Sequence, residues 1–338
     1  QAIDILAATA EIEARLGYKP SSEQMKIIEA ILDGSRGNGR LDASAGSGKT
    51  TSLMMIDIVI AMMGGSACYL AFSKEMEREI QLKKQQYGLS MECKTTYSLG
   101  MSAVSSYLKK RNIKVSVNAD KYQAIIEPMS RAVYDANHVY DVYELDFFDW
   151  NSAIQKLVNF ARLSLTQCKE ADLQDLANYY NIDIISPLMP QIATLVSEVL
   201  LIGEKVALTT GEIDFGDMIW LPNVVKGMYV WGYRWLLVDE CQDISRAQLM
   251  LVMQACARDG RIIFCGDRDQ SLFGFAGANP ESFDDIKRIA KTEDLSLYVS
   301  WRCPKSHIAL AQNIVPKIKH ADTAIDGNVF YIDDANVI

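Results

Sequence analysis

The chain alternates short apolar runs, each ending in polar residues, with longer stretches whose apolar positions repeat at helical spacing. Residues 39–43 (GRLDA) lead into a glycine-bearing loop and a helix, and residues 66–72 (SACYLAF) lead into a charged helix. The same order recurs at residues 90–96, 233–240, 261–267 and 294–301. Apolar strands that alternate with helices are typical of a parallel sheet covered by helices. The pattern therefore predicts an α/β fold whose parallel sheet is flanked by helices.

Strand signals become rare between residues 105 and 208. Four segments here have helical apolar spacing, namely residues 122–137, 151–165, 171–180 and 190–208. This spacing predicts an all-helical subdomain inserted within the α/β domain. Two further helices are expected at residues 1–16 and 19–34, the second capped at Ser21 or Ser22, and a last strand at residues 327–338.

Composition places the chain among soluble globular proteins, because 49% of its 338 residues are hydrophobic and 23% are charged. The richest apolar stretch, residues 52–63, is short and carries Asp57, so it is interpreted as a buried helix and not as a membrane span. The N-terminal residues lack the basic start and the cleavage site of a signal peptide. We therefore expect a cytoplasmic location without membrane contact.

Charge and cysteine usage argue against two kinds of chemistry. The net charge of −9 disfavours bulk electrostatic attraction to nucleic acid, although it is compatible with a local groove. The seven cysteines are scattered, never in C-x-x-C spacing, and only three histidines accompany them. Because a zinc site needs clustered ligands, these cysteines are interpreted as reduced apolar side chains.

A phosphate-binding loop is the most specific motif. Residues 43–51 (ASAGSGKTT) follow a predicted strand and open a helix, and they match G-x-x-x-x-G-K-[ST] except that Ala43 replaces the first glycine. Glycines let the backbone curl so that its N–H groups face phosphate oxygens, and the helix N-terminus adds partial positive charge. Lys49 is expected to reach the β- and γ-phosphates of ATP, and Thr50 to bind Mg²⁺. The loop residues predicted to bind the nucleotide are Ala45, Gly46, Ser47, Gly48, Lys49, Thr50 and Thr51.

A P-loop requires an acidic residue at the end of a neighbouring strand. Residues 235–243 (WLLVDECQD) supply Asp239 and Glu240 after four apolar positions. Asp239 is predicted to hold Mg²⁺, and Glu240 to polarise the attacking water. The alternative is that the two acids cap a helix, because Ser245 and Arg246 follow closely.

Seven segments resemble, in chain order, the motifs of superfamily 1 helicases of the UvrD/Rep type. They are residues 19–24, 70–80, 95–100, 213–219, 239–243, 266–278 and 297–315. The predicted helical insertion also falls where that family carries one. The resemblance implies a RecA-like domain and an ATP-dependent DNA helicase or single-stranded DNA translocase that uses ATP and Mg²⁺.

The resemblance also implies roles for residues around the nucleotide. Gln24 would read the adenine edge, and Trp301 would stack on adenine. Gln270 would sense the γ-phosphate, and Arg302 would contact it, as the ability of a guanidinium to stabilise transition-state charge also suggests. The competing interpretation of residues 300–302 is a buried tryptophan beside a surface arginine. The expected catalytic set is Lys49, Glu240, Gln270 and Arg302.

Single-stranded DNA would cross the carboxyl ends of the strands, where ligands bind in open α/β sheets. Aromatic side chains can bind single-stranded DNA of any sequence by stacking, because every base has a π-face. For Phe72, at a strand end, core packing explains the residue equally well. The residues expected to contact DNA are Phe72, Lys74, Thr95, Tyr97, Ser98, Phe273 and Phe275.

Two departures from the family pattern stand out. Ala276 occupies a position where the family usually has arginine, which removes one charge-assisted contact. We expect the second RecA-like domain to be largely missing. The expected boundaries are 1–104 and 209–320 for the two parts of the ATP-binding domain, 105–208 for the helical insertion and 321–338 for the start of a truncated second domain.

The expected partners are single-stranded DNA, or a junction of single- and double-stranded DNA, and a missing C-terminal motor domain. That domain would lie in a longer polypeptide, as we favour, or in a partner chain. One alternative is a nucleotide-gated DNA-binding or scaffolding module without motor activity. Another is the ATPase part of a helicase–nuclease complex.

Overall fold

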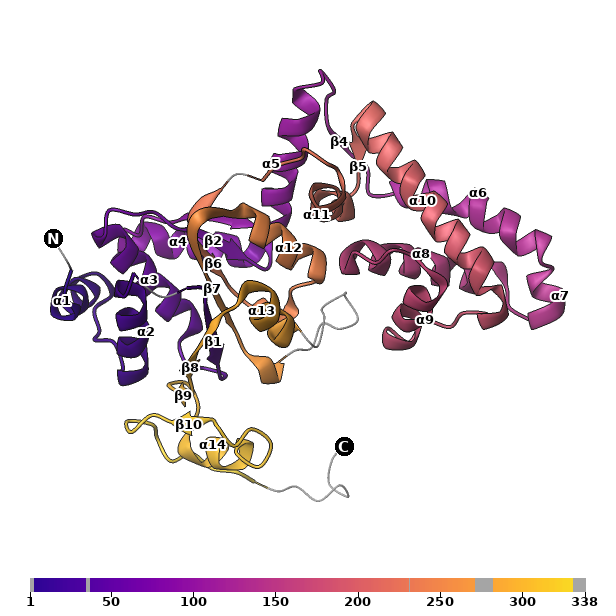
Figure 1. Ribbon diagram of the computed structural model, residues 1–338. Coiled ribbons are helices and arrows are strands. Elements are labelled where there is room, and N and C mark those ends of the chain that lie inside the picture. The colour runs from indigo at the N-terminus through magenta and orange to yellow at the C-terminus, as the bar shows by residue number, and fades with distance from the viewer. Residues whose placement is uncertain (1–2, 35–36, 231, 271–281, 331–338) are drawn as a thin grey trace.

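The computed structural model describes residues 3–34, 37–230, 232–270 and 282–330, and Figure 1 shows how its elements are arranged. At its centre is a six-stranded sheet of order β3-β2-β6-β7-β1-β8, with every neighbouring pair parallel. The predicted α/β fold is therefore confirmed. The strands are β1 (Gly39–Ala43), β2 (Cys68–Ala71), β3 (Glu92–Thr95), β6 (Tyr233–Val238), β7 (Cys256–Gly266) and β8 (Glu293–Leu297).

Both faces of the sheet are buried, because successive strand residues point to opposite sides. Leu237 and Ile263 belong to one apolar cluster, whereas the preceding residues Leu236 and Ile262 belong to the other. Helices cover each face (Figure 1). The first cluster includes residues of α1 (Ile5–Leu16), α2 (Ser22–Leu32), α3 (Lys49–Met62) and α4 (Lys74–Tyr87). The second includes residues of α5 (Thr96–Lys109), α11 (Phe215–Val224), α12 (Arg246–Ala255) and α13 (Ser282–Ala290).

The predicted buried helix in the apolar stretch is α3, and its one acidic residue is satisfied. Asp57 is 0% exposed, and its carboxylate accepts hydrogen bonds from the backbone N–H (2.8 Å) and the hydroxyl (3.0 Å) of Ser90. Burial raises the pKa of Asp57, and these hydrogen bonds offset part of the cost of burying its charge. The helix can therefore pack inside the domain despite the charge.

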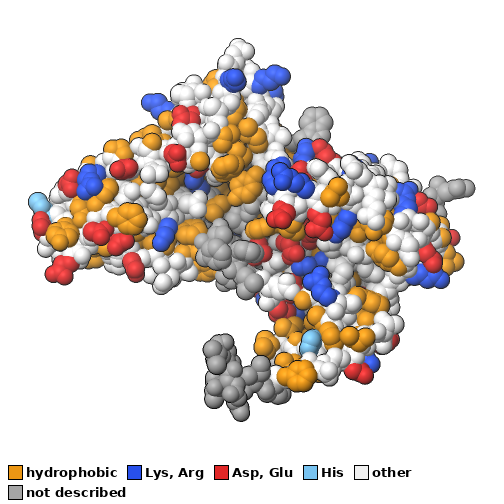
Figure 2. Space-filling model, turned by 180° about the vertical axis from the view of Figure 1, so that it is seen from behind, with side chains coloured by type: hydrophobic (Ala, Val, Ile, Leu, Met, Phe, Trp, Pro, Cys, Tyr) orange, Lys and Arg blue, Asp and Glu red, His pale blue; other side chains and the backbone are white. Residues whose placement is uncertain are grey.

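The inserted helical region projects to one side of the sheet domain (Figures 1 and 2). A third apolar cluster, running from Ala103 to Met228, joins these helices to α5 and α11. The insert leaves and rejoins the sheet domain through a parallel pair of short strands, β4 (Ser116–Val117) and β5 (Glu212–Ile213). Its helices are α6 (Lys121–Ala136), α7 (Val139–Tyr143), α8 (Phe147–Ser164), α9 (Glu170–Tyr179) and α10 (Met189–Thr210).

A buried ion-pair network fastens the insert to the start of α11. Lys121 of α6 is 2% exposed and lies 2.5 Å from Asp217, which is 0% exposed. Arg162 of α8 pairs with Asp214 at 2.7 Å, and Asp214 caps α11 by accepting the Asp217 N–H. Charges removed from water are tolerated only when they are well paired. The network therefore fixes how α6 and α8 meet α11.

The strand pattern at residues 294–301 is split in the structure. β8 ends at Leu297, and β9 (Val299–Ser300) pairs instead with β10 (Lys319–His320) around α14 (Lys305–Ala311). The carboxylate of Glu23 accepts the backbone N–H groups of Tyr298 (3.0 Å) and Val299 (3.1 Å), which diverts the chain at this point. We call residues 299–320 the C-terminal unit. In the last predicted strand, residues 327–330 are not in a strand and the others lie outside the described residues.

Candidate functional site

The predicted phosphate loop connects β1 to α3 as a tight turn at the carboxyl end of the sheet. Gly46 (φ +72°) and Gly48 (φ +88°) both adopt the left-handed conformation that glycine tolerates without strain. A Cβ on Gly46 would lie 2.8 Å from both the Arg302 Cβ and the Ser300 Oγ. The loop therefore needs glycine here for its backbone shape and for its close approach to the C-terminal unit.

A cavity of about 550 Å³ opens over this loop and brings together most of the residues predicted to bind or hydrolyse nucleotide. Residues from five separate parts of the chain form its wall, so the fold brings together residues that are far apart in the sequence. Lys83 of α4 also lines it and was not predicted. The predicted residues in the wall are Ala45, Gly46, Ser47, Gly48, Lys49, Thr50, Thr51, Glu240, Gln270, Trp301 and Arg302.

The ammonium of Lys49 lies 2.7 Å from the Glu240 carboxylate, across 191 residues of sequence. Burial alone would lower the pKa of Lys49, but the charge of Glu240 and the hydrogen bond to it raise that pKa above its ordinary value. The lysine is therefore fully charged at neutral pH. It faces the cavity where a polyanion could compete with Glu240 for it.

Asp239 is 4% exposed and is not among the residues that line the cavity, although its neighbour Glu240 is. Burial and the neighbouring charge of Glu240 raise the pKa of Asp239 to about 6, while a hydrogen bond from the Tyr69 hydroxyl opposes this rise. A nearby divalent cation would favour the ionised carboxylate. The helix-cap interpretation of these acids is wrong, because Ser245 caps α12 by accepting the Gln248 N–H.

The donor set fits Mg²⁺ in the way that nucleotide sites usually hold it. Mg²⁺ prefers oxygen ligands and is bound through one or two protein oxygens together with substrate phosphates. The oxygens predicted to hold it are the Thr50 hydroxyl in the cavity wall and the Asp239 carboxylate, whose charge acts on Lys49 of the loop. Among the residues that the structure describes, no cluster of three or more His, Cys, Asp or Glu side chains could hold a metal by itself.

Gln242 is a site residue that the sequence reasoning missed, although it lies inside the quoted DECQD segment. Its amide nitrogen donates to Glu240 Oε2 (2.7 Å), and its amide oxygen accepts the backbone N–H of Asp267 (3.0 Å). It thereby connects the acid pair to the 3₁₀ turn η3 (Arg268–Gln270), which ends in exposed Gln270. Spacing alone could not reveal this bridge, because β6 and β7 bring its two ends together.

A smaller cavity of about 290 Å³ adjoins the first and contains Gln24. The Gln24 side chain accepts the Ser21 N–H (2.9 Å) and donates to the Ser52 hydroxyl (3.1 Å), so Ser21 is the helix cap. Trp301 lines both cavities and is 56% exposed, which rules out the alternative of a buried tryptophan. Its backbone N–H donates to Gly46 (2.9 Å), so the ring and the phosphate loop are held together.

The residues predicted to contact DNA in the first half of the chain share another hollow, of about 520 Å³, at the carboxyl ends of β2 and β3. Phe72 is partly exposed and lines it, so this side chain is not part of the core. Sequence reasoning missed Phe215, which is 57% exposed at the start of α11. The hollow is lined by Phe72, Ser73, Lys74, Thr95, Tyr97, Ser98, Met101, Phe215 and Met218.

The serine and threonine hydroxyls in this hollow are already engaged. Thr95 and Ser98 form a reciprocal capping box at the start of α5, with the Thr95 hydroxyl accepting the Ser98 N–H (3.1 Å). Lys74 pairs with Glu77 at 2.6 Å but is 66% exposed, so its ammonium can reach a new anion. Tyr97 is mostly buried, and burial together with the charge of Asp214 raises its pKa. Phe273, Phe275 and Ala276 lie outside the described residues.

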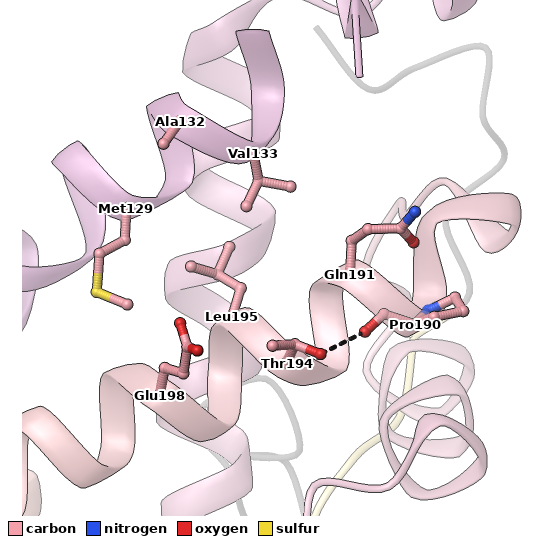
Figure 3. A pocket seen from close by; sticks show the side chains of 8 residues that line it. All are labelled: Met129, Ala132, Val133, Pro190, Gln191, Thr194, Leu195 and Glu198. Atoms are coloured by element: carbon pink, nitrogen blue, oxygen red, sulfur yellow. Dashed lines mark hydrogen bonds between the residues drawn. The ribbon is translucent and has the colours of Figure 1, made fainter. Parts of the chain in front are cut away.

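A hollow of about 490 Å³ lies elsewhere, between α6 and α10 of the insert (Figure 3). Its wall is mostly apolar, and the Thr194 hydroxyl in it donates to the Pro190 carbonyl (3.0 Å). Glu198 is the one charged residue of this wall. This wall offers no group of polar side chains that could act together, so the candidate site consists of the two adjoining cavities over the phosphate loop and the hollow at the ends of β2 and β3.

Fold and site together define a P-loop domain of the RecA-like class. The chain also matches the family model of the UvrD/REP helicase N-terminal domain over residues 22–291, most of its length. The chain therefore belongs to the UvrD/REP helicase family.

Individual relatives are similar over shorter stretches. The ATP-dependent DNA helicase UvrD1 of Mycobacterium tuberculosis is 28% identical over 121 residues, covering 31% of this chain and 16% of the relative. The ATP-dependent DNA helicase PcrA of Bacillus subtilis is 34% identical over 93 residues, 25% of this chain and 12% of the relative. DNA helicase II of Rickettsia typhi is 28% identical over 131 residues, 36% of this chain and 20% of the relative. The chain thus spans only a small part of the length of these relatives.

No helix in the described part of the chain is both long and apolar enough to cross a membrane.

Proposed function

We propose that this chain is the ATP-hydrolysing, single-strand-binding portion of a DNA helicase or translocase motor. One observation carries the proposal: the nucleotide cavity and the aromatic hollow lie along the same edge of one sheet. The cavity lies over the ends of β1 and β6, and the hollow over the ends of β2 and β3. Because β2 lies between β3 and β6, the two sites are adjacent and a shift in one can reach the other.

Chemistry at the nucleotide would use groups that the fold already holds in place. Bound Mg-ATP would supply the γ-phosphoryl group and a cation that neutralises its charge. Lys49 would exchange Glu240 for phosphate oxygens, and the released Glu240, still bonded to Gln242, would accept a proton from the attacking water. Thr50 and Asp239 would hold the metal. Arg302 would stabilise negative charge from the opposite wall of the cavity.

Single-stranded DNA would be bound by base stacking and a few local contacts and not by overall charge, since the chain carries a net charge of −9. Positive and negative side chains are interspersed over the face in Figure 2, which shows no broad basic surface. Phe72 and Phe215 would stack on bases, and Lys74 would contact a phosphate. We also propose that stepping along DNA requires a second RecA-like domain, in the same polypeptide or in a partner chain.

The test is ATP hydrolysis by this chain with and without a single-stranded oligothymidylate. We expect hydrolysis that DNA stimulates and that Lys49→Ala abolishes. Lys156→Ala, an exposed lysine on α8, is the matched control and should behave as the wild type. Full activity in Lys49→Ala would overturn the assignment of the phosphate loop. Nucleotide binding without any hydrolysis would instead indicate a nucleotide-gated binding module.

The DNA arm of the test compares two phenylalanines. Loss of one stacked base costs ~1–3 kcal/mol, so Phe72→Ala should weaken oligothymidylate binding by roughly 5- to 150-fold. Phe148→Ala removes a ring that is 80% exposed on α8, away from the hollow, and should leave the affinity unchanged. Equal affinities for the two variants would remove the hollow from the DNA path.

A further inference from the structure

Lys317 makes a contact between parts of the chain that are far apart in sequence. It lies in the C-terminal unit between α14 and β10, and its ammonium is 2.7 Å from Asp42 and 2.9 Å from Asp269. Asp42 belongs to β1, one residue before its end, and Asp269 belongs to η3, one residue before Gln270. One cation therefore joins the strand that enters the phosphate loop to the turn that carries the predicted γ-phosphate sensor.

The geometry requires a cation at this position. Two carboxylates that face the same point would repel each other if Lys317 were neutral or absent. Asp42 also accepts a hydrogen bond from the Tyr298 hydroxyl (3.2 Å), and the Lys317 ammonium lies 5.4 Å from the centre of that ring. Burial lowers the pKa of Lys317, but its hydrogen bonds to the two carboxylates outweigh this effect and raise the pKa overall. Lys317 thus stays charged across the physiological range.

A continuous line of polar contacts connects this cluster to the phosphate loop. The Asp269 N–H donates to the Asp267 carboxylate (3.0 Å), and the Asp267 N–H donates to Gln242 (3.0 Å). Gln242 donates to Glu240 (2.7 Å), which pairs with Lys49 (2.7 Å). Two of these links, Asp267–Gln242 and Glu240–Lys49, join segments that are far apart in the sequence. If Lys49 released Glu240 to bind a nucleotide, the contact at the phosphate-loop end of this line would break first.

We propose that Lys317 is a positioning residue that holds residues 267–270 against the end of β1 and links them to the C-terminal unit. The inference rests on the proposed function, because the turn it holds carries Gln270. An isolated surface ion pair contributes little to stability. Lys317 differs from such a pair because its side chain is only 26% exposed and contacts two partners.

The first test measures amide hydrogen exchange without nucleotide in the wild type, Lys317→Met and Lys319→Met. Lys319 lies two residues away on β10 and is exposed, so it is a matched control. We expect faster exchange in peptides covering residues 39–47 and 262–270 in Lys317→Met alone. Exchange equal to that of Lys319→Met would overturn the proposal. Faster exchange throughout the sheet, including β2 and β3, would also overturn it, because the role would then be general stability.

The second test is kinetic and separates positioning from binding. Misplacement of a reacting group by about 1 Å can reduce a rate 100-fold, so Lys317→Met should lower the kcat of DNA-stimulated hydrolysis by about 10- to 100-fold. The KM for ATP should change less than about 3-fold, because Lys317 does not line the nucleotide cavity. Lys317→Arg should recover most of the lost rate, since it keeps the cation.

The outcomes distinguish the inference from the proposed function. An unchanged kcat in Lys317→Met, or no recovery in Lys317→Arg, would overturn the role of Lys317. A wild-type chain that binds no ATP would refute the proposed function instead. The exchange comparison would still decide whether Lys317 holds the turn, because it is made without nucleotide.

Discussion

Replacing Gly46 with alanine tests whether the shape of the phosphate loop depends on its contact with the C-terminal unit. The substitution has two separable costs. A left-handed conformation costs a non-glycine residue roughly 1–2 kcal/mol. In addition, the new Cβ would lie 2.8 Å from the Arg302 Cβ and the Ser300 Oγ, where ordinary contacts are 3.4–4 Å. One side must therefore move by roughly 1 Å.

Gly17 provides a control that carries only the first cost. It ends α1 at φ +82°, and a Cβ there would meet nothing within 4 Å. Gly17→Ala should lose roughly 1–2 kcal/mol of unfolding free energy in urea titrations, and Gly46→Ala should lose somewhat more because it carries both costs. Only Gly46→Ala should displace Arg302 from the loop, which we expect to weaken binding of a fluorescent ATP analogue by about 10- to 100-fold, because a hydrogen bond to a charged group contributes about 1.5–3 kcal/mol.

Comparison of the two variants tests whether the close approach of Arg302 to the phosphate loop matters for nucleotide binding. If Gly46→Ala bound the analogue as tightly as Gly17→Ala, the approach of Arg302 to the loop would not matter for the nucleotide. If Gly46→Ala lost several kcal/mol more than Gly17→Ala, the contact would matter mainly for folding. The expected result is a small difference in stability with a large difference in binding.

Three further predictions concern the buried charges. Glu240→Gln should bind ATP at least as tightly as the wild type, because Lys49 loses its competing carboxylate, but it should not hydrolyse ATP. Normal turnover by this variant would show that Glu240 is not the catalytic base. Asp239→Asn should stabilise the nucleotide-free chain by about 3 kcal/mol at pH 8, because it removes an ionised carboxylate whose pKa the fold raises to about 6. Below about pH 3 that gain should vanish, because the wild-type carboxyl is then largely protonated in both the folded and the unfolded state. A gain that is independent of pH in urea titrations across this range would contradict the prediction. Lys121→Met should cost ~3–5 kcal/mol at pH 7, because it leaves Asp217 buried without its closest cation. That loss should be smaller at pH 5, because burial already raises the pKa of Asp217 and protonation removes the unpaired charge. A loss of the same size at pH 5 and pH 7 would show that packing and not charge is responsible.

Much of the fold and the nucleotide site is readable from local sequence. The phosphate loop is specified within nine residues, because glycines, a strand end and a helix start together determine its backbone. Asp239 and Glu240 are recognisable at the end of an apolar strand for a similar reason. The division of residues 294–301 into β8 and β9 was not predictable, because the carboxylate of Glu23, some 275 residues earlier, takes the backbone N–H groups there.

The sequence by itself determined which elements form and which side chains carry chemistry, since hydrophobic period, glycine placement and strand-end acids act over a few residues. Only the tertiary structure decided which of them meet. The strand order β3-β2-β6-β7-β1-β8 sets Lys49 beside Glu240, puts Gln242 against Asp267, and brings Lys317 to both Asp42 and Asp269. Strand order and the position of the C-terminal unit arise from the packing of whole layers, which no short stretch of sequence specifies.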